Sequence, residues 1–171
     1  MFKILSFIGM INSEQHMTIE KEKYKHMKKI LLYVIAVVVL IQLFRPTKND
    51  SKNYTNDISK EVVVTDEIQK IIETSCADCH SNATVYPWYA EIAPISWYLA
   101  SHVNEGKEHL NFSEWTSYNK HQKEHILKNL KEVMTSHEMP LQSYLILHEN
   151  AQLSKEQYEV FLTWVNTIKI H

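Results

Sequence analysis

Glycine is scarce in this sequence: Gly9 and Gly106 are the only two among 171 residues. Folds rich in β-strands need turn residues that tolerate a positive φ, and glycine is the usual one. The shortage therefore favours an all-α fold. A chain of this length has room for one compact domain and an appended segment.

An excess of charge of one sign is also missing, because 18 Lys and Arg face 20 Asp and Glu. A chain so close to neutral creates no strong overall field that would attract a polyanion. We therefore do not expect nucleic acid among the partners of this protein.

Cysteine is limited to Cys76 and Cys79, which are separated by two residues. A single close pair cannot form a framework of disulfides, and this spacing is typical of a cofactor site or a redox pair.

One long apolar run is present, from Ile30 to Phe44, with lysines before it and Arg45-Pro46 after it. It is shorter than the roughly 20 residues of a full membrane span, although Lys29 and Arg45 can extend it by reaching to the bilayer surfaces. The run has no polar face, which argues against a core helix, and no small-residue cleavage site follows it. We therefore predict an uncleaved membrane anchor, rather than a cleaved signal, over residues 27–45.

Residues 1–26 form a leader without a recognisable role. Met27-Lys28-Lys29, followed at once by the apolar run, has the layout of an export signal. This layout favours Met27 over Met1 as the true start. Lysines lie on both sides of the run, with a slight excess on the N-terminal side, so the positive-inside rule weakly favours an inward N-terminus.

Residues 46–63 are rich in Lys, Asn, Asp, Ser and Thr, a composition that predicts a flexible linker. The folded domain is then expected at residues 64–171. Capping and periodicity predict helices that begin after Thr65, run from Pro94 to about Glu105 with Gly106 as the stop, run from Tyr118 to about Met134, and begin after Ser154. Their apolar faces are Ile68, Ile71 and Ile72; Ile95, Tyr98, Leu99, His102 and Val103; Ile126, Leu127, Leu130, Val133 and Met134; and Tyr158, Phe161, Leu162, Val165 and Ile168.

The sequence Cys76-Ala77-Asp78-Cys79-His80 is the motif that carries chemistry. Each thiol can add to one vinyl group of a haem, and the adjacent histidine then becomes an axial ligand of the iron. Two alternatives remain: a zinc site, for which His102 and His109 are the nearest further ligands, and a dithiol redox pair. The motif favours haem c, because covalent attachment takes place outside the bacterial cytoplasm and the apolar run provides for export.

Met139 is the expected sixth ligand of the iron. Pro140 disfavours helix at the residue before it, so Met139 should lie in an extended loop. Met134, in contrast, belongs to an apolar helix face and is expected in the core. The alternatives are His102, then His109, His137 or an open position. Trp88 and Trp97 are equally compatible with a haem wall and with a core.

Five segments together resemble the bacterial haem-binding domain family typical of Bacteroidetes: the Cys76–His80 motif, NATVYPWY, PISWYLASHVNEGKEHLNFSEW, Glu138-Met139-Pro140 and LSKEQYEVFLTW. The resemblance covers about residues 60–170. It implies an exported or anchored protein in which Cys76, Cys79 and His80 hold the haem, and it says little about the physiological partner.

His/Met ligation leaves no free site on the iron and raises its potential relative to bis-His ligation. We therefore expect a one-electron carrier rather than an enzyme, with redox proteins as partners and no small-molecule substrate. We expect a single-pass inner-membrane protein whose haem domain faces the periplasm. The alternative is a haem enzyme, peroxidase-like or the haem subunit of a dehydrogenase, with an open sixth site; a sensor would need an effector larger than residues 1–26.

Overall fold

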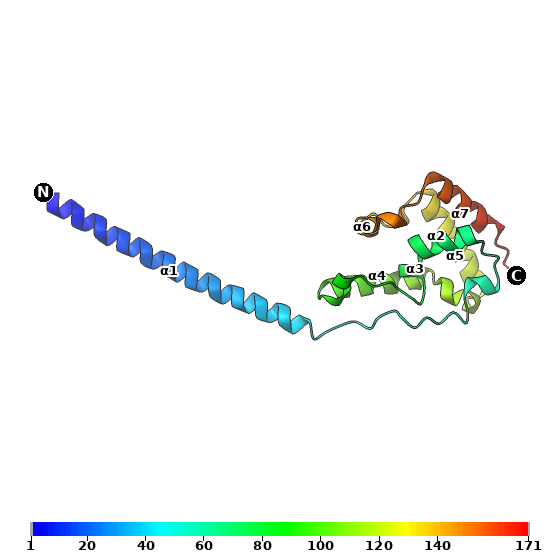
Figure 1. The fold of residues 1–171 in the computed structure, drawn as a ribbon, viewed down its shortest axis with the longest axis horizontal. Helices are drawn as coiled ribbons and strands as arrows, with labels where there is room; N and C mark the ends of the chain where they lie inside the picture. Colours follow the sequence, from blue (N-terminus) through cyan, green and yellow to red (C-terminus); the bar gives the residue numbers. More distant parts are fainter. Residues whose placement is uncertain (1, 171) are drawn as a thin grey trace. The chain divides into compact units, whose positions relative to one another are not determined.

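The computed structural model describes the backbone of residues 2–170, together with the side chains of Met17 and residues 20–170, and this part of the chain is helical without any strand (Figure 1). The expected all-α fold is confirmed. The chain divides into two units, Met1–Arg45 and Pro46–His171.

The first unit is built on one helix, α1 (Phe2–Ile41). Its apolar side chains from Ile30 to Leu40 are exposed, with Leu32 at 65%. Across residues 2–170, however, no helix combines the length and hydropathy needed to cross a membrane. The anchor predicted at 27–45 is therefore not supported by this helix.

The second unit holds all the remaining helices, most of them short. They are η1 (Ile58–Lys60), α2 (Asp66–Ser75), α3 (Ala77–His80), η2 (Trp88–Glu91), α4 (Ile95–His109), η3 (Phe112–Ser117), α5 (Lys120–Thr135), α6 (Gln142–Leu145), η4 (Glu149–Ala151) and α7 (Lys155–Thr167).

Side-chain caps begin α2, α5 and α7, three of the helices that the sequence predicts. The Thr65 hydroxyl accepts a hydrogen bond from the Ile68 N–H, and Asn119 and Ser154 each form a complete capping box. Such caps satisfy backbone donors that the first helical turn leaves free. The predicted starts of α2 and α7 are confirmed, and α5 begins two residues later than expected because Asn119, rather than a residue before Tyr118, is its cap.

The predicted stop of α4 at Gly106 is wrong, because the helix continues to His109. Glycine is common at the end of a helix, which is the basis of the prediction. Gly106 lies inside the helix and packs closely against Cys79.

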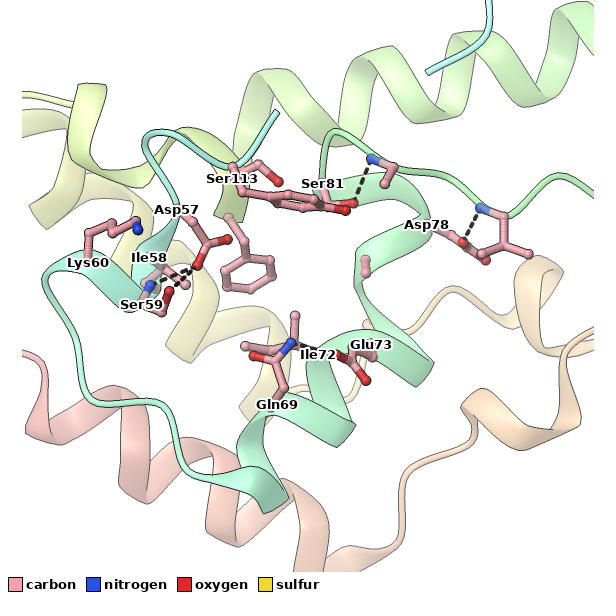
Figure 2. A pocket seen from close by; sticks show the side chains of 15 residues that line it. Asp57, Ile58, Ser59, Lys60, Gln69, Ile72, Glu73, Asp78, Ser81 and Ser113 are labelled. Atoms are coloured by element: carbon pink, nitrogen blue, oxygen red, sulfur yellow. Dashed lines mark hydrogen bonds between the residues drawn. The ribbon is translucent and has the colours of Figure 1, made fainter. Parts of the chain in front are cut away.

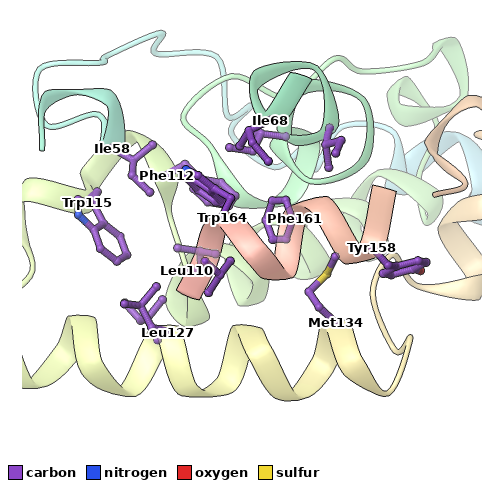
Figure 3. Close-up of a cluster of buried hydrophobic side chains, with 14 of the residues drawn as sticks. Ile58, Ile68, Leu110, Phe112, Trp115, Leu127, Met134, Tyr158, Phe161 and Trp164 are labelled. Atoms are coloured by element: carbon purple, nitrogen blue, oxygen red, sulfur yellow. The ribbon is translucent and has the colours of Figure 1, made fainter. Parts of the chain in front are cut away.

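The core lies where α2, α5 and α7 meet the segment around η3 (Figure 3). Phe161 and Val165 are fully buried, and Met134 is 2% exposed, which confirms its core position. Trp115 and Trp164 supply the large aromatic rings of this core, and the Trp164 indole N–H donates to the Val63 carbonyl oxygen (2.9 Å). Trp88, in contrast, is 76% exposed and is not a core residue.

The segment predicted as a flexible linker belongs to the second unit and is attached to it at several points. Ile58 is 4% exposed and belongs to the core. The Asn49 amide donates to the Ser81 carbonyl oxygen (2.7 Å), and the Lys52 N–H donates to that of Asn82 (3.1 Å). Composition misled the prediction, because these polar groups bond to fixed partners rather than to water.

Asn82 is the centre of this polar attachment and is itself 6% exposed. Its amide nitrogen donates to the Asn53 carbonyl (3.0 Å) and to the Glu114 carboxylate (2.7 Å), and its amide oxygen accepts from Asn111 (2.8 Å). Its N–H donates to the Ser113 hydroxyl (3.1 Å). The buried Asn82 side chain thus links the segment around Asn53 and η3 to the residues that directly follow the Cys76–His80 motif.

Candidate functional site

The Cys76–His80 motif forms a single helical turn at the end of α2. Cys76 ends α2 and precedes α3, and its carbonyl oxygen accepts from the N–H groups of Cys79 (3.2 Å) and His80 (2.9 Å). Residues three and four apart lie on the same side of a helical turn. The turn therefore gathers both thiols and the imidazole on one side.

Both cysteines are free thiols and half-buried. Burial, with a smaller contribution from the neighbouring Cys79, raises the pKa of Cys76 to about 12. Burial, with a smaller contribution from Asp78, raises the pKa of Cys79 to about 11. A dithiol redox site requires a lowered thiol pKa, so these shifts argue against that alternative.

His80 is held by the chain that leaves α4. Its Nδ1 lies 2.9 Å from the Leu110 carbonyl oxygen. Because a carbonyl can only accept, Nδ1 carries the proton and Nε2 keeps a free lone pair. Burial lowers the pKa of His80 and so favours the neutral ring, despite its backbone hydrogen bonds. A neutral imidazole with one nitrogen tied to a carbonyl is the form that binds a metal through the other nitrogen.

Gly106 allows α4 to approach the motif closely. A Cβ at this position would lie 2.8 Å from the Cys79 carbonyl oxygen and 3.0 Å from its Cβ. These separations are shorter than ordinary van der Waals contact, so only glycine fits without a shift of one of the two helices. Sequence reasoning noticed Gly106 but gave it the wrong role.

Replacing Gly106 with alanine tests this contact by the sign of its effect. In an exposed helix the change would stabilise by about 1 kcal/mol. Here we expect the free energy of unfolding to fall by about 1–3 kcal/mol, because the methyl group overlaps Cys79. Urea unfolding followed by circular dichroism measures the free energy of unfolding. Ser101→Ala, at an exposed position of α4, is the control. An increase in the unfolding midpoint of Gly106→Ala would contradict the contact.

Asp78, between the two cysteines, organises the surroundings of the motif. Its Oδ1 accepts from the Val85 N–H (2.8 Å) and its Oδ2 from the Tyr144 hydroxyl (2.7 Å). Its carbonyl oxygen accepts from the Thr84 hydroxyl (2.6 Å). Burial and the bond to Asp78 raise the pKa of Tyr144, so its hydroxyl stays protonated and donates. Sequence reasoning missed both side chains, because nothing local to Tyr144 points to Asp78.

The face of α4 that leads away from Gly106 is incompletely covered. His102 and Val103 share this face, being four and three residues before Gly106. Val103 is buried, but Tyr98 is 56% and Ile95 42% exposed, so the face predicted as core is only partly so. The ring of Tyr98 meets that of His102 edge-on at 4.2 Å, and the His102 Nε2 is buried without a hydrogen-bond partner.

Met139 lies in the loop between α5 and α6, outside any helix, as predicted. Its side chain is half-buried against the edge of the core, as is that of Cys76. Its carbonyl oxygen accepts from the Tyr158 hydroxyl (2.9 Å). Among the alternatives, His109 is exposed at the end of α4, and His137 is exposed with its ring 4.3 Å from that of Tyr158. The ligand role of Met139 stays a prediction.

A separate pocket of about 460 Å³ lies beside the motif (Figure 2). Asp78 borders it, together with polar side chains such as Asp57, Lys60 and Gln69. Neither cysteine lines this pocket, and nor does His80 or Met139. It is therefore not the site that the motif defines.

The residues of the motif fit a haem. Two thiols could form thioethers and a neutral, oriented imidazole could bind the iron, the His102 Nε2 is buried without a partner, and apolar side chains are partly exposed on α4, the helix whose Gly106 contacts Cys79. A porphyrin needs such an apolar wall. For zinc, the described side chains, those of Met17 and residues 20–170, include no group of three or more His, Cys, Asp or Glu placed to bind a metal ion.

A helical unit that presents two thiols and a tethered imidazole on one turn is compatible with the class of haem-binding domains. The chain belongs to the haem-binding domain family: the family model matches residues 36–167, which confirms the family and begins earlier than the expected residue 60. No curated protein and no solved structure matches the chain.

Proposed function

We propose that this protein is a c-type cytochrome that transfers single electrons. Cys76 and Cys79 would hold the haem through thioether bonds, His80 would be one axial ligand and Met139 the other. The observation that carries the proposal is the hydrogen bond from His80 Nδ1 to the Leu110 carbonyl, which leaves Nε2 free to bind iron. When bound, the haem supplies a one-electron ferrous/ferric couple.

The chain contributes orientation and exclusion of water. The Leu110 carbonyl fixes the rotation of the His80 ring, and Gly106 brings α4 against Cys79. The partly exposed apolar side chains of α4 would cover the haem, which lowers the local polarity and so influences the potential of the iron.

We propose further that the haem unit faces the periplasm of a bacterial inner membrane and exchanges electrons with redox proteins. Covalent attachment requires export, and the exposed apolar side chains of α1 from Ile30 to Leu40 offer a surface for lipid. Because the described helices lack a full span, membrane attachment rests on this apolar surface and on the flanking Lys29 and Arg45.

A visible spectrum of protein co-expressed with a cytochrome c maturation system tests the proposal. We expect a c-type pyridine haemochrome, and a ferric form with the weak red band of an iron–methionine bond. Protein that matures without haem would overturn the proposal. A high-spin, five-coordinate ferric spectrum would keep the haem but favour a haem enzyme with an open sixth site.

A further inference from the structure

We propose that the hydrogen bond between the Tyr144 hydroxyl and the Asp78 carboxylate is a latch that holds the Met139–Tyr144 segment over the attachment motif. This inference rests on the proposed function, since it assigns a positioning role at the same site. Its consequence is that Asp78 and Tyr144, without touching the iron, set how firmly Met139 is retained as a ligand.

The Asp78 side of the latch is rigid. Asp78 lies between the two cysteines, so its position is fixed to the turn that would carry the haem. The Val85 N–H occupies one carboxylate oxygen (2.8 Å), which orients the other toward Tyr144. A carboxylate acceptor also makes this bond stronger than one between neutral groups.

The Tyr144 side is prepared in the same way. The ring of Tyr144 stacks on that of His148, with centroids 4.0 Å apart and planes within 9°. The His148 Nδ1 lies 3.0 Å from the Tyr144 carbonyl oxygen, so His148 is tied to the same turn. Tyr144 is therefore held in position before it meets Asp78.

Apart from the buried Pro140 and Leu145, the segment between these points is loosely packed. α6 is a single turn, and the neighbouring Leu141, Ile146 and Leu147 are 39%, 76% and 64% exposed. At its other end, the Tyr158 hydroxyl binds the Met139 carbonyl. Two tyrosine hydroxyls thus fix the loop that carries Met139, one at each end. Loss of the Asp78 end should let Met139 leave the iron more often.

The test is the rate at which cyanide replaces the sixth ligand of the ferric, haem-loaded protein. Tyr144→Phe keeps the ring and its stacking and removes only the hydroxyl. We expect about ten- to a hundredfold faster cyanide binding, the loss that one hydrogen bond to a charged group implies. Tyr54→Phe, at a half-exposed tyrosine outside α6, is the control and should leave the rate unchanged.

Asp78→Ala provides a second variant should Tyr144→Phe fail to fold, and it should accelerate cyanide binding similarly. The double variant should be no faster than the faster single variant, because all three lack the same bond. A rate for Tyr144→Phe within twofold of the parent, with full haem content, would overturn the latch alone. Absence of the iron–methionine band in the parent would also overturn it, whereas absence of haem would overturn the proposed function.

Discussion

Replacing both Cys76 and Cys79 with serine should yield protein from which acidified acetone removes all of the haem. Serine keeps the size of the side chain but cannot form a thioether, and the chain has no other cysteine. In the parent protein the same treatment should leave the haem on the polypeptide. Intact-protein mass spectrometry before and after extraction measures the difference.

The single variants Cys76→Ser and Cys79→Ser are matched controls, because each retains one thioether. Their haem should resist extraction, and their pyridine haemochromes should shift to the red relative to the parent, since one vinyl group remains conjugated. Haem that stays bound in the double variant after extraction would show that the attachment does not involve these thiols.

Replacing Met139 with alanine should abolish the iron–methionine band and lower the midpoint potential. The expected fall is a sizeable part of the roughly 0.8 V range over which axial ligands tune haem iron. Met139 is half-buried at the core's edge, so folding should survive the loss at a cost of about 2 kcal/mol. Spectroelectrochemistry measures the band and the potential on one sample.

His102→Ala is the matched control for this second experiment, because His102 is the strongest competitor and has a buried nitrogen without a partner. It should retain the band and a potential close to that of the parent. An unchanged low-spin spectrum in Met139→Ala, together with a high-spin spectrum in His102→Ala, would transfer the ligand role to His102.

Local signals were sufficient for much of the fold. The caps at Thr65 and Ser154 depend on a few adjacent residues, and helical spacing predicts the buried face of α2 and, for α7, Tyr158, Phe161 and Val165 but not the buried Trp164. The Cys76–His80 motif likewise lies on one helical turn because its residues are consecutive. Such features are predictable because the residues that determine them are neighbours in sequence.

Long-range relations were not predictable in this way. Gly106 appeared to end a helix because its true neighbour, Cys79, is far away in sequence. The bond between Asp78 and Tyr144 joins side chains 66 residues apart. The polar stretch before Val64 is predicted as flexible because its hydrogen-bond partners, Ser81 and Asn82, are distant in sequence.

That polar stretch also limits where a fragment that contains the intact haem-binding unit can begin. A fragment starting at Val64, the boundary that composition suggests, would lack Ile58 and expose the hydrophobic surface beneath it. It would also strip the Asn53 carbonyl from Asn82, close to the motif. A fragment starting at Pro46 retains every one of these contacts and coincides with the second unit of the fold.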